Sequence, residues 1–211
     1  MFKQVIWDFN GTILDDVNLC LTIINRMLEK RKLKRLSLAD YRDAFDFPVQ
    51  KYYQSVGFDF DREPFPMLAH EYMDQYLKAS LRCGLRDGIP EVLAVLDQSN
   101  VRQVLLSATK ISILLDQVKS LKISDYFDPI LGLDDILGTS KREMAGRWFS
   151  SQTIRAAETV LIGDTTHDDE VARQIGCSSI LLTGGHNSQA RLHARGARVL
   201  DHPAEILAVV L

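Results

Sequence analysis

Short apolar runs that alternate with helical patterns constrain the fold of this chain most strongly. Six runs have the length of buried strands, at residues 5–7, 101–106, 129–131, 159–162, 179–183 and 197–200. Apolar residues at helical spacing, such as those between Ile111 and Leu121, lie between most of these runs. Strands that alternate with helices favour a parallel sheet covered by helices on both faces. We therefore expect an α/β fold with a Rossmann-like, doubly wound core.

One long segment interrupts this alternation. Residues 17–28 and 68–77 each carry an apolar stripe at helical spacing, and no convincing strand pattern lies between them. We interpret residues 16–84 as an inserted α-helical subdomain. The α/β core is then expected to comprise residues 1–15 and 85–211.

Composition and charge exclude several classes of protein. The formal net charge of −3 and the pI near 5.9 argue against a general nucleic-acid binder, which tends to be basic. No apolar stretch approaches the roughly 20 residues that a membrane-spanning helix needs. The first ten residues lack the apolar core of a signal peptide. Three widely spaced cysteines indicate free thiols, so we expect a cytoplasmic protein. Its oligomeric state is not fixed by the sequence.

Polar side chains follow three of the predicted strands at the point where each strand ends. Asp8 follows the first run, Ser107 follows the second and Asp164 follows the run at 159–162. Ligands of an open parallel sheet bind beyond the carboxyl ends of its strands, so these side chains are expected to lie close together. Lys141 begins the helical segment before Asp164, where a cation faces the unfavourable end of the helix dipole. A bound anion would resolve that conflict.

Taken singly, these residues have structural explanations: Asp8 as a turn residue, Ser107 as a helix cap, and Lys141 as a solvated lysine. Taken together, they fit phosphoryl transfer. Two carboxylates can hold Mg²⁺, and a hydroxyl and an ammonium can bind the phosphoryl oxygens. The free oxygen of Asp8 could then attack phosphorus.

Four motifs in order resemble those of the haloacid dehalogenase-like hydrolases, in the phosphoglycolate-phosphatase-like branch that carries a helical cap. They are DFNGT (8–12), LLSAT (105–109), Lys141 and GDTTHD (163–168). The separations of 99, 34 and 23 residues between Asp8, Ser107, Lys141 and Asp164 are typical of the family. The resemblance covers essentially the whole chain and implies a phosphohydrolase of small phosphorylated metabolites.

The resemblance also implies a role for each motif residue. Asp8 would be the nucleophile, and Asp8, the backbone carbonyl of Asn10 and Asp164 would bind Mg²⁺. Asp168 would support the metal site or orient Lys141. The expected catalytic set is Asp8, Asn10, Ser107 and Lys141. The phosphate would contact Gly11, Thr12, Ser107, Ala108 and Lys141.

Asn10 departs from the pattern of the phosphatases, which carry an aspartate there that protonates the leaving group and deprotonates water. An amide does neither. General acid–base catalysis is worth about 10²–10⁴-fold, or roughly 3–5 kcal/mol of barrier. Three alternatives follow: a phosphatase that is slow or limited to good leaving groups, a phosphate-ester-binding protein, or a relative that cleaves carbon–phosphorus or carbon–halogen bonds. Carbon–phosphorus cleavage would need a cap lysine, for which Lys51 is the candidate.

The inserted subdomain is expected to close over the site and to select the substrate. Phe45 and Phe47 are interpreted either as an apolar wall of the site or as part of the core of the insertion. His167 is either a polar loop residue or a neighbour of the substrate. The basic segment 29–36 is either a solvated helix face or an attractor of anions.

Overall fold

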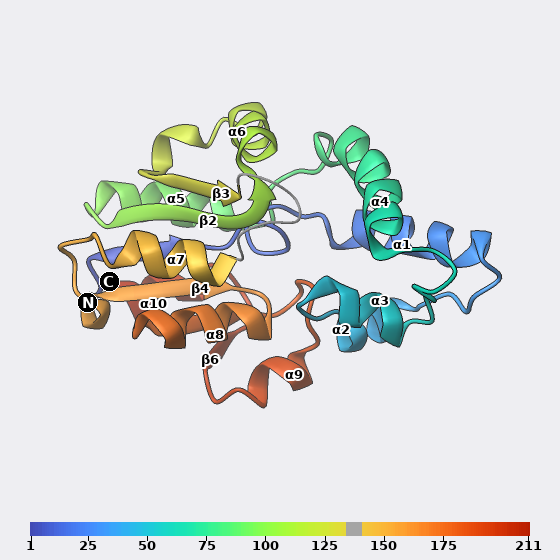
Figure 1. Ribbon diagram of the computed structural model, residues 1–211. Helices are drawn as coiled ribbons and strands as arrows, with labels where there is room; N and C mark the ends of the chain where they lie inside the picture. Colours follow the sequence, from blue (N-terminus) through green and yellow to red (C-terminus); the bar gives the residue numbers. More distant parts are fainter. Residues whose placement is uncertain (134–140) are drawn as a thin grey trace.

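The computed structural model describes residues 1–133 and 141–211. Its centre is a parallel sheet of six strands in the order β3-β2-β1-β4-β5-β6 (Figure 1). The strands are β1 (Gln4–Trp7), β2 (Arg102–Lys110), β3 (Ile130–Leu133), β4 (Thr159–Gly163), β5 (Ser178–Leu182) and β6 (Arg198–Leu200). Each of the six expected runs forms one of these strands, which confirms the expected fold class.

Alternation of side chains along the central strands divides the core into two layers. Val5 and Trp7 of β1 pack on one face of the sheet, and Ile6 packs on the other. Helices α5 (Ile89–Gln98), α6 (Ile111–Ser120) and α10 (Glu205–Val210) cover the first face. Helices α7 (Lys141–Phe149) and α8 (Thr166–Ile175) cover the second, and the short helix α9 (Gln189–His193) precedes β6 (Figure 1).

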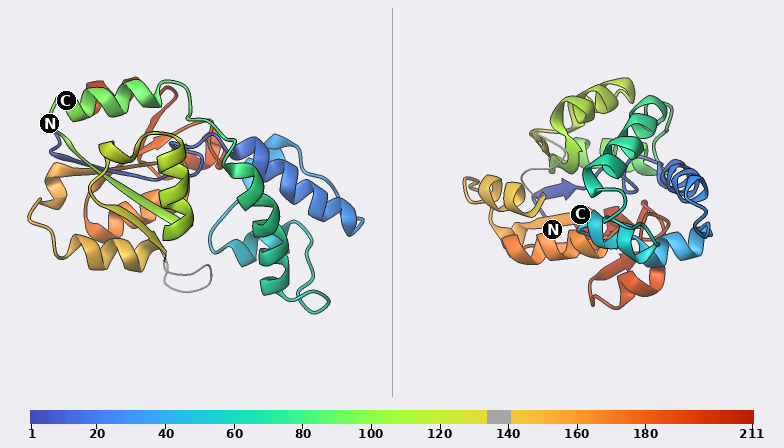
Figure 2. Two further views of the ribbon diagram at one scale, coloured as in Figure 1. Left: turned by 90° about the horizontal axis from the view of Figure 1, so that it is seen from above. Right: turned by 45° about the vertical axis from the view of Figure 1, so that its right-hand side comes forward.

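Four helices make up the insertion that follows β1, and α5 then leads back to the sheet. They are α1 (Val17–Lys30), α2 (Leu38–Ala44), α3 (Val49–Ser55) and α4 (Phe65–Ser80). Their apolar side chains form a separate cluster around Met27, Tyr41 and Tyr53. Figure 2 shows this helical insertion beyond one end of the sheet, with both chain termini at the opposite end. The termini are joined there by a hydrogen bond from Phe2 N to Val210 O (2.9 Å).

The chain leaves the core for the insertion and returns from it at neighbouring points. A bridge between Leu14 and Leu85 brings the outgoing and returning chains together. Leu115 departs from the expected pattern, because this side chain is 46% exposed although it belongs to the apolar stripe of α6. Leu114 and Val118 are the buried residues that pack α6 on the sheet, and Leu115 is not needed for that contact.

Strand order places the edge of the sheet where ligands bind. β1 lies between β2 and β4, and the chain order reverses at this point. In doubly wound sheets the binding crevice lies outside the carboxyl ends of the strands at such a reversal. No helix in residues 1–133 and 141–211 is long and apolar enough to cross a membrane. Cys20, Cys83 and Cys177 are all free thiols, as expected.

Candidate active site

The carboxyl ends of β1 and β4 bring Asp8 and Asp164 to the crevice. Asp8 directly follows β1, and its backbone N donates to Ile162 O of β4 (2.8 Å). Asp164 directly follows β4 and is completely buried. Ser107 lies in the neighbouring strand β2, which runs on to Lys110. Three parallel strands therefore carry these side chains to one edge of the sheet, as the sequence predicted.

Lys141 is the first residue of α7 and reaches the same point. Its Nζ donates to Asp8 Oδ1 and to Asp168 Oδ1, the latter at 2.6 Å. The side chain is 4% exposed. The two carboxylates raise the pKa of Lys141 above its usual value although burial alone would lower it. The carboxylates of Asp8 and Asp168 offset the unfavourable interaction between this ammonium and the helix dipole.

Asp168 connects this ion pair to the first turn of α8. Its Oδ2 accepts from the backbone N (3.0 Å) and Oγ1 (2.7 Å) of Thr165. This contact is the reciprocal cap of a helix N-terminus, and it fixes the rotamer of the carboxylate. Burial would raise the pKa of Asp168, but Lys141 holds it below its usual value. The ionised form of Asp168 is therefore favoured by its contact with Lys141.

Asp164 is enclosed by close backbone and side-chain contacts. Its Oδ1 accepts from Thr12 Oγ1 (2.7 Å), and its Oδ2 accepts from the backbone N of His186 (2.6 Å). A Cβ atom at Gly185 would lie 2.2 Å from Asp164 Oδ2, and one at Gly11 would lie 2.5 Å from it. Gly11 also has a φ of +74°, which favours glycine. The glycines let two loops close on this carboxylate.

The site carries more negative than positive charge. Asp8, Asp164 and Asp168 each place a carboxylate oxygen within 4.8 Å of the others, and all three are buried. One ammonium, that of Lys141, faces them within the described part of the chain. Burial raises the pKa of Asp8 and of Asp164; the charge on Lys141 opposes the rise at Asp8, and the charge on His186 opposes it at Asp164. Three buried carboxylates that gather their oxygens at one point fit a divalent cation such as Mg²⁺.

The other expected phosphate contacts differ in burial and in their present hydrogen-bond partners. Ser107 is fully buried, and its Oγ accepts from the backbone N of Thr109 (3.0 Å). Thr12 Oγ1 donates to Asp164, and the backbone N of Gly11 donates to Leu14 O (3.0 Å) and to Asp16 Oδ1 (2.9 Å). Ala108 is exposed at the edge of the sheet. The Gly11 amide is therefore directed into its own loop.

Asn10 lies at the centre of a hydrogen-bond network that the sequence did not predict. Its Nδ2 donates to Asp16 Oδ2 (2.9 Å) and to Tyr76 Oη (2.6 Å). Its Oδ1 accepts from Thr109 Oγ1 (2.9 Å) and lies 3.4 Å from Ser107 Oγ. Asn10 therefore links the loop after β1 to β2 and to helix α4 of the insertion.

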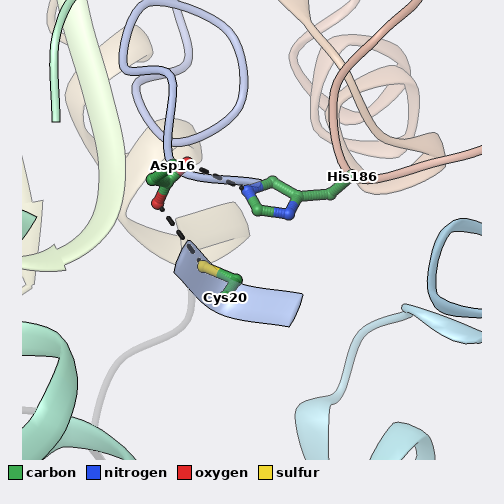
Figure 3. Close-up of side chains that lie close together, drawn as sticks. All are labelled: Asp16, Cys20 and His186. Carbon is green, nitrogen blue, oxygen red and sulfur yellow. Dashed lines mark hydrogen bonds and ion pairs between the residues drawn. The ribbon is translucent and has the colours of Figure 1, made fainter. Parts of the chain in front are cut away.

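Asp16 and His186 form a buried ion pair beside Asn10. His186 Nε2 lies 3.2 Å from Asp16 Oδ1, and Cys20 Sγ lies 3.7 Å from Asp16 Oδ2 (Figure 3). Burial would lower the pKa of His186, but the Asp16 carboxylate raises it to about 9. Burial would raise the pKa of Asp16, but His186 and the hydrogen bonds from Tyr76 and Asn10 hold it below its usual value.

The insertion contacts the core through α2 and the loop that follows it. Tyr41 Oη lies 2.8 Å from His186 Nδ1, and Arg42 Nε donates to Gly185 O (2.8 Å). Phe47 stacks on His167 with ring centroids 4.7 Å apart. Phe45 packs with the core of the insertion and lies 5.0 Å from the ring of His186. His167 and Phe47 thus meet across the boundary between insertion and core.

Two further candidates, Lys51 and the basic segment 29–36, belong to the helical insertion. Lys51 is exposed on α3. In the basic segment 29–36, Arg31 pairs with Glu63 and Glu71 of the insertion at 2.5 and 2.7 Å. These ion pairs give Arg31 a structural role.

Comparisons with known proteins agree with this arrangement. The family model described as haloacid dehalogenase-like hydrolase matches residues 5–182. A phosphoglycolate phosphatase of Pectobacterium atrosepticum is 30% identical over 125 residues, 58% of this chain and 53% of that protein. The chain thus spans about half the length of this relative. A phosphoglycolate phosphatase of Caulobacter vibrioides is 21% identical over 207 residues, 94% of this chain and 86% of that protein.

The fold has a close counterpart among solved structures. A haloacid dehalogenase-like family hydrolase of Streptococcus pneumoniae superposes with a TM-score of 0.83 at 20% identity, over 100% of this chain and 99% of that one. Its likeness extends over the sheet and the helical insertion alike. Since the family model covers most of the sequence, the chain belongs to the haloacid dehalogenase-like hydrolases.

Proposed function

We propose that this chain is a Mg²⁺-dependent phosphohydrolase that acts on a small phosphorylated metabolite through an aspartyl-phosphate on Asp8. The observation that carries the proposal is the convergence of three buried carboxylates and Lys141 at the reversal point of the sheet. The similarity to phosphoglycolate phosphatases supports a phosphomonoester as substrate. Helices α1 to α4, within residues 16–84, would serve as the cap.

The residues of the site divide the work of phosphoryl transfer. An oxygen of Asp8 forms a bond to phosphorus while the bond from phosphorus to the leaving oxygen breaks. Lys141 and Ser107 would bind the other phosphoryl oxygens, and Asp168 holds Lys141 in place. Water then attacks phosphorus, and the carboxylate of Asp8 is released. The leaving oxygen departs as an anion that takes a proton from solvent, and the attacking water gives its proton to solvent.

Asp8, Asp164 and the backbone carbonyl of Asn10 would hold the metal ion. When bound, the ion neutralises charge on the phosphoryl oxygens and fixes their position. Thr12 and the backbone N of His186 orient Asp164 for this role through hydrogen bonds of 2.7 and 2.6 Å. The positive charges of Lys141 and of the metal ion would offset the charges of the three carboxylates. This compensation would account for the burial of so many ionisable groups together.

Asn10 restricts the substrates that turn over fast. Both of its amide hydrogens are donated, to Asp16 and Tyr76, and an amide does not exchange protons in the working range of pH. A leaving group that departs as a stable anion, such as a phenolate or a carboxylate, needs no proton from the protein. We therefore propose aryl, enol or acyl phosphates as the substrates cleaved fastest.

The test measures phosphate release from an aryl phosphate and from an alkyl phosphate, with Mg²⁺ and with a chelator. We expect Mg²⁺-dependent release that favours the aryl ester. Asp8→Asn should abolish it, whereas Asp15→Asn, an exposed position in the same loop, should not. Release that survives Asp8→Asn would refute the assignment of the nucleophile.

A second candidate function is phosphate-ester binding with little turnover, and the immobilised amide of Asn10 favours it. Titration calorimetry with inorganic phosphate and Mg²⁺ distinguishes the two. Binding without release from either ester would support the second function. Absence of both binding and release would refute both.

A further inference from the structure

Asn10 occupies a position in which every polar atom of its side chain has a fixed partner. The two hydrogens of Nδ2 point to Asp16 and to Tyr76, and Oδ1 receives the hydroxyl of Thr109. Asp16 accepts hydrogen bonds but donates none while ionised, so it selects the nitrogen end of the amide. The orientation of Asn10 is therefore set by Asp16.

Asp16 itself is 1% exposed and has donors on both carboxylate oxygens. Oδ1 accepts from the backbone N of Gly11 (2.9 Å) and faces His186 Nε2 (3.2 Å). Oδ2 accepts from Asn10 and from Tyr76 Oη (2.7 Å). An ionised carboxylate at position 10 would face Asp16 Oδ2, which is itself an acceptor. The hydrogen bond that Asn10 Nδ2 now donates to this oxygen would be lost.

The same carboxylate connects the catalytic loop to the insertion. Tyr76 lies on α4, and Tyr41 of α2 reaches His186 Nδ1 from the other side (2.8 Å). Gly11 lies next to Asn10, whose carbonyl is a proposed metal ligand. Asp16 thus fixes the loop that follows Asp8 and holds two helices of the insertion against it.

We propose that Asn10 and Asp16 form one charge-matched pair, in which Asp16 is the positioning residue and a carboxylate at position 10 is productive only when position 16 is neutral. This inference rests on the proposed function for its consequence in catalysis. Its structural part rests on the hydrogen bonds alone.

The test is a cycle of three variants, Asn10→Asp, Asp16→Asn and the double variant, assayed with an alkyl phosphate and Mg²⁺. An alkyl ester needs a proton on its leaving oxygen, so it reports what position 10 contributes. We expect Asn10→Asp alone to leave kcat within threefold of wild type or below it. The double variant should exceed Asn10→Asp at least tenfold in kcat, with KM changed less than threefold.

The neighbouring Asp15 provides the matched control, because it is exposed and carries the same charge. Asp15→Asn should not alter kcat in wild type or in Asn10→Asp. A gain of 10²-fold or more in Asn10→Asp alone, with no further change on adding Asp16→Asn, would overturn the pairing. An equal rescue by Asp15→Asn would overturn it as well, since a general effect of charge would then suffice.

A second readout separates this inference from the proposed function. The urea midpoint of Asn10→Asp should lie below that of wild type, and the midpoint of the double variant should lie above the value that the sum of the two single shifts gives. Strictly additive shifts of the midpoint would overturn the pairing. If no variant releases phosphate from the alkyl ester or from an aryl ester, the proposed function fails, and the midpoints still decide whether the two side chains are matched.

Discussion

The buried pair of His186 and Asp16 predicts how stability changes with pH. His186 is 4% exposed, and its pKa is raised from 6.5 to about 9 in the folded protein. A group with a raised folded pKa binds its proton more tightly in the native state. Its contribution to stability is therefore complete below pH 6.5 and is lost as the pH rises through about 9.

The size of this loss follows from the shift. A rise from 6.5 to about 9 at 1.36 kcal/mol per pH unit corresponds to about 3 kcal/mol of unfolding free energy. The measurement is urea unfolding of wild type and His186→Gln in metal-free buffer between pH 6.5 and 10. The difference between the two proteins should shrink by about 3 kcal/mol over this range. Subtraction cancels the contributions of titrating groups that do not interact with His186.

His167→Gln is the matched control. Burial lowers the pKa of His167, so its contribution is present above its unfolded pKa and lost as the pH falls. The difference between wild type and His167→Gln should therefore be constant from about pH 7.5 to 10. A difference for His186→Gln that varied by less than about 1 kcal/mol between pH 6.5 and 10 would refute the reasoning, because His186 would then not be held charged by Asp16.

Three further predictions concern the carboxylates and the insertion. Lys141→Met leaves two buried carboxylates without their cation and should cost about 3–5 kcal/mol of unfolding free energy at pH 7, less when Mg²⁺ is present; a cost that Mg²⁺ does not reduce would contradict a cation site there. Gly163→Ala places a Cβ 2.2 Å from Asp168 Cγ and should cost about 1–3 kcal/mol, whereas Gly84→Ala, with no atom within 4 Å, should stay within about 0.5 kcal/mol in a urea titration. Arg191→Ala removes donors to the backbone at the end of α2 and should speed amide hydrogen exchange there at least tenfold, with unchanged exchange in α5 as the control.

Strand ends made the central part of the site predictable. Asp8, Ser107 and Asp164 each follow or end an apolar run, and the rule for parallel sheets brings such residues together. The unfavourable position of Lys141 at the beginning of a helix indicated a bound anion, and the structure places the side-chain carboxylates of Asp8 and Asp168 there. Both the strand ends and the beginning of the helix can be recognised from the sequence alone, without knowledge of tertiary packing.

The network around Asn10 could be predicted only in part. His186 follows β5 by a few residues, so the same strand-end rule indicates it, although the sequence analysis did not apply the rule there. Asp15 and Asp16 are adjacent, and only the direction of α1 decides that Asp16 is the buried one. Tyr76 belongs to an apolar stripe of α4, and no spacing reveals that its hydroxyl reaches across to the core. Contacts between insertion and core depend on tertiary geometry.

The loop between β5 and α9 serves two parts of the molecule at once. The backbone N of His186 holds Asp164, while the carbonyls of Gly184 and Gly185 bind Arg42 of α2 at 2.5 and 2.8 Å. Asn187 Nδ2 donates to Phe45 O (2.8 Å) in the chain after α2. A swing of α2 away from the sheet would either break these bonds or drag the loop with it. The insertion is therefore mechanically coupled to Asp164, the proposed metal ligand, so that a displacement of α2 would misalign this carboxylate.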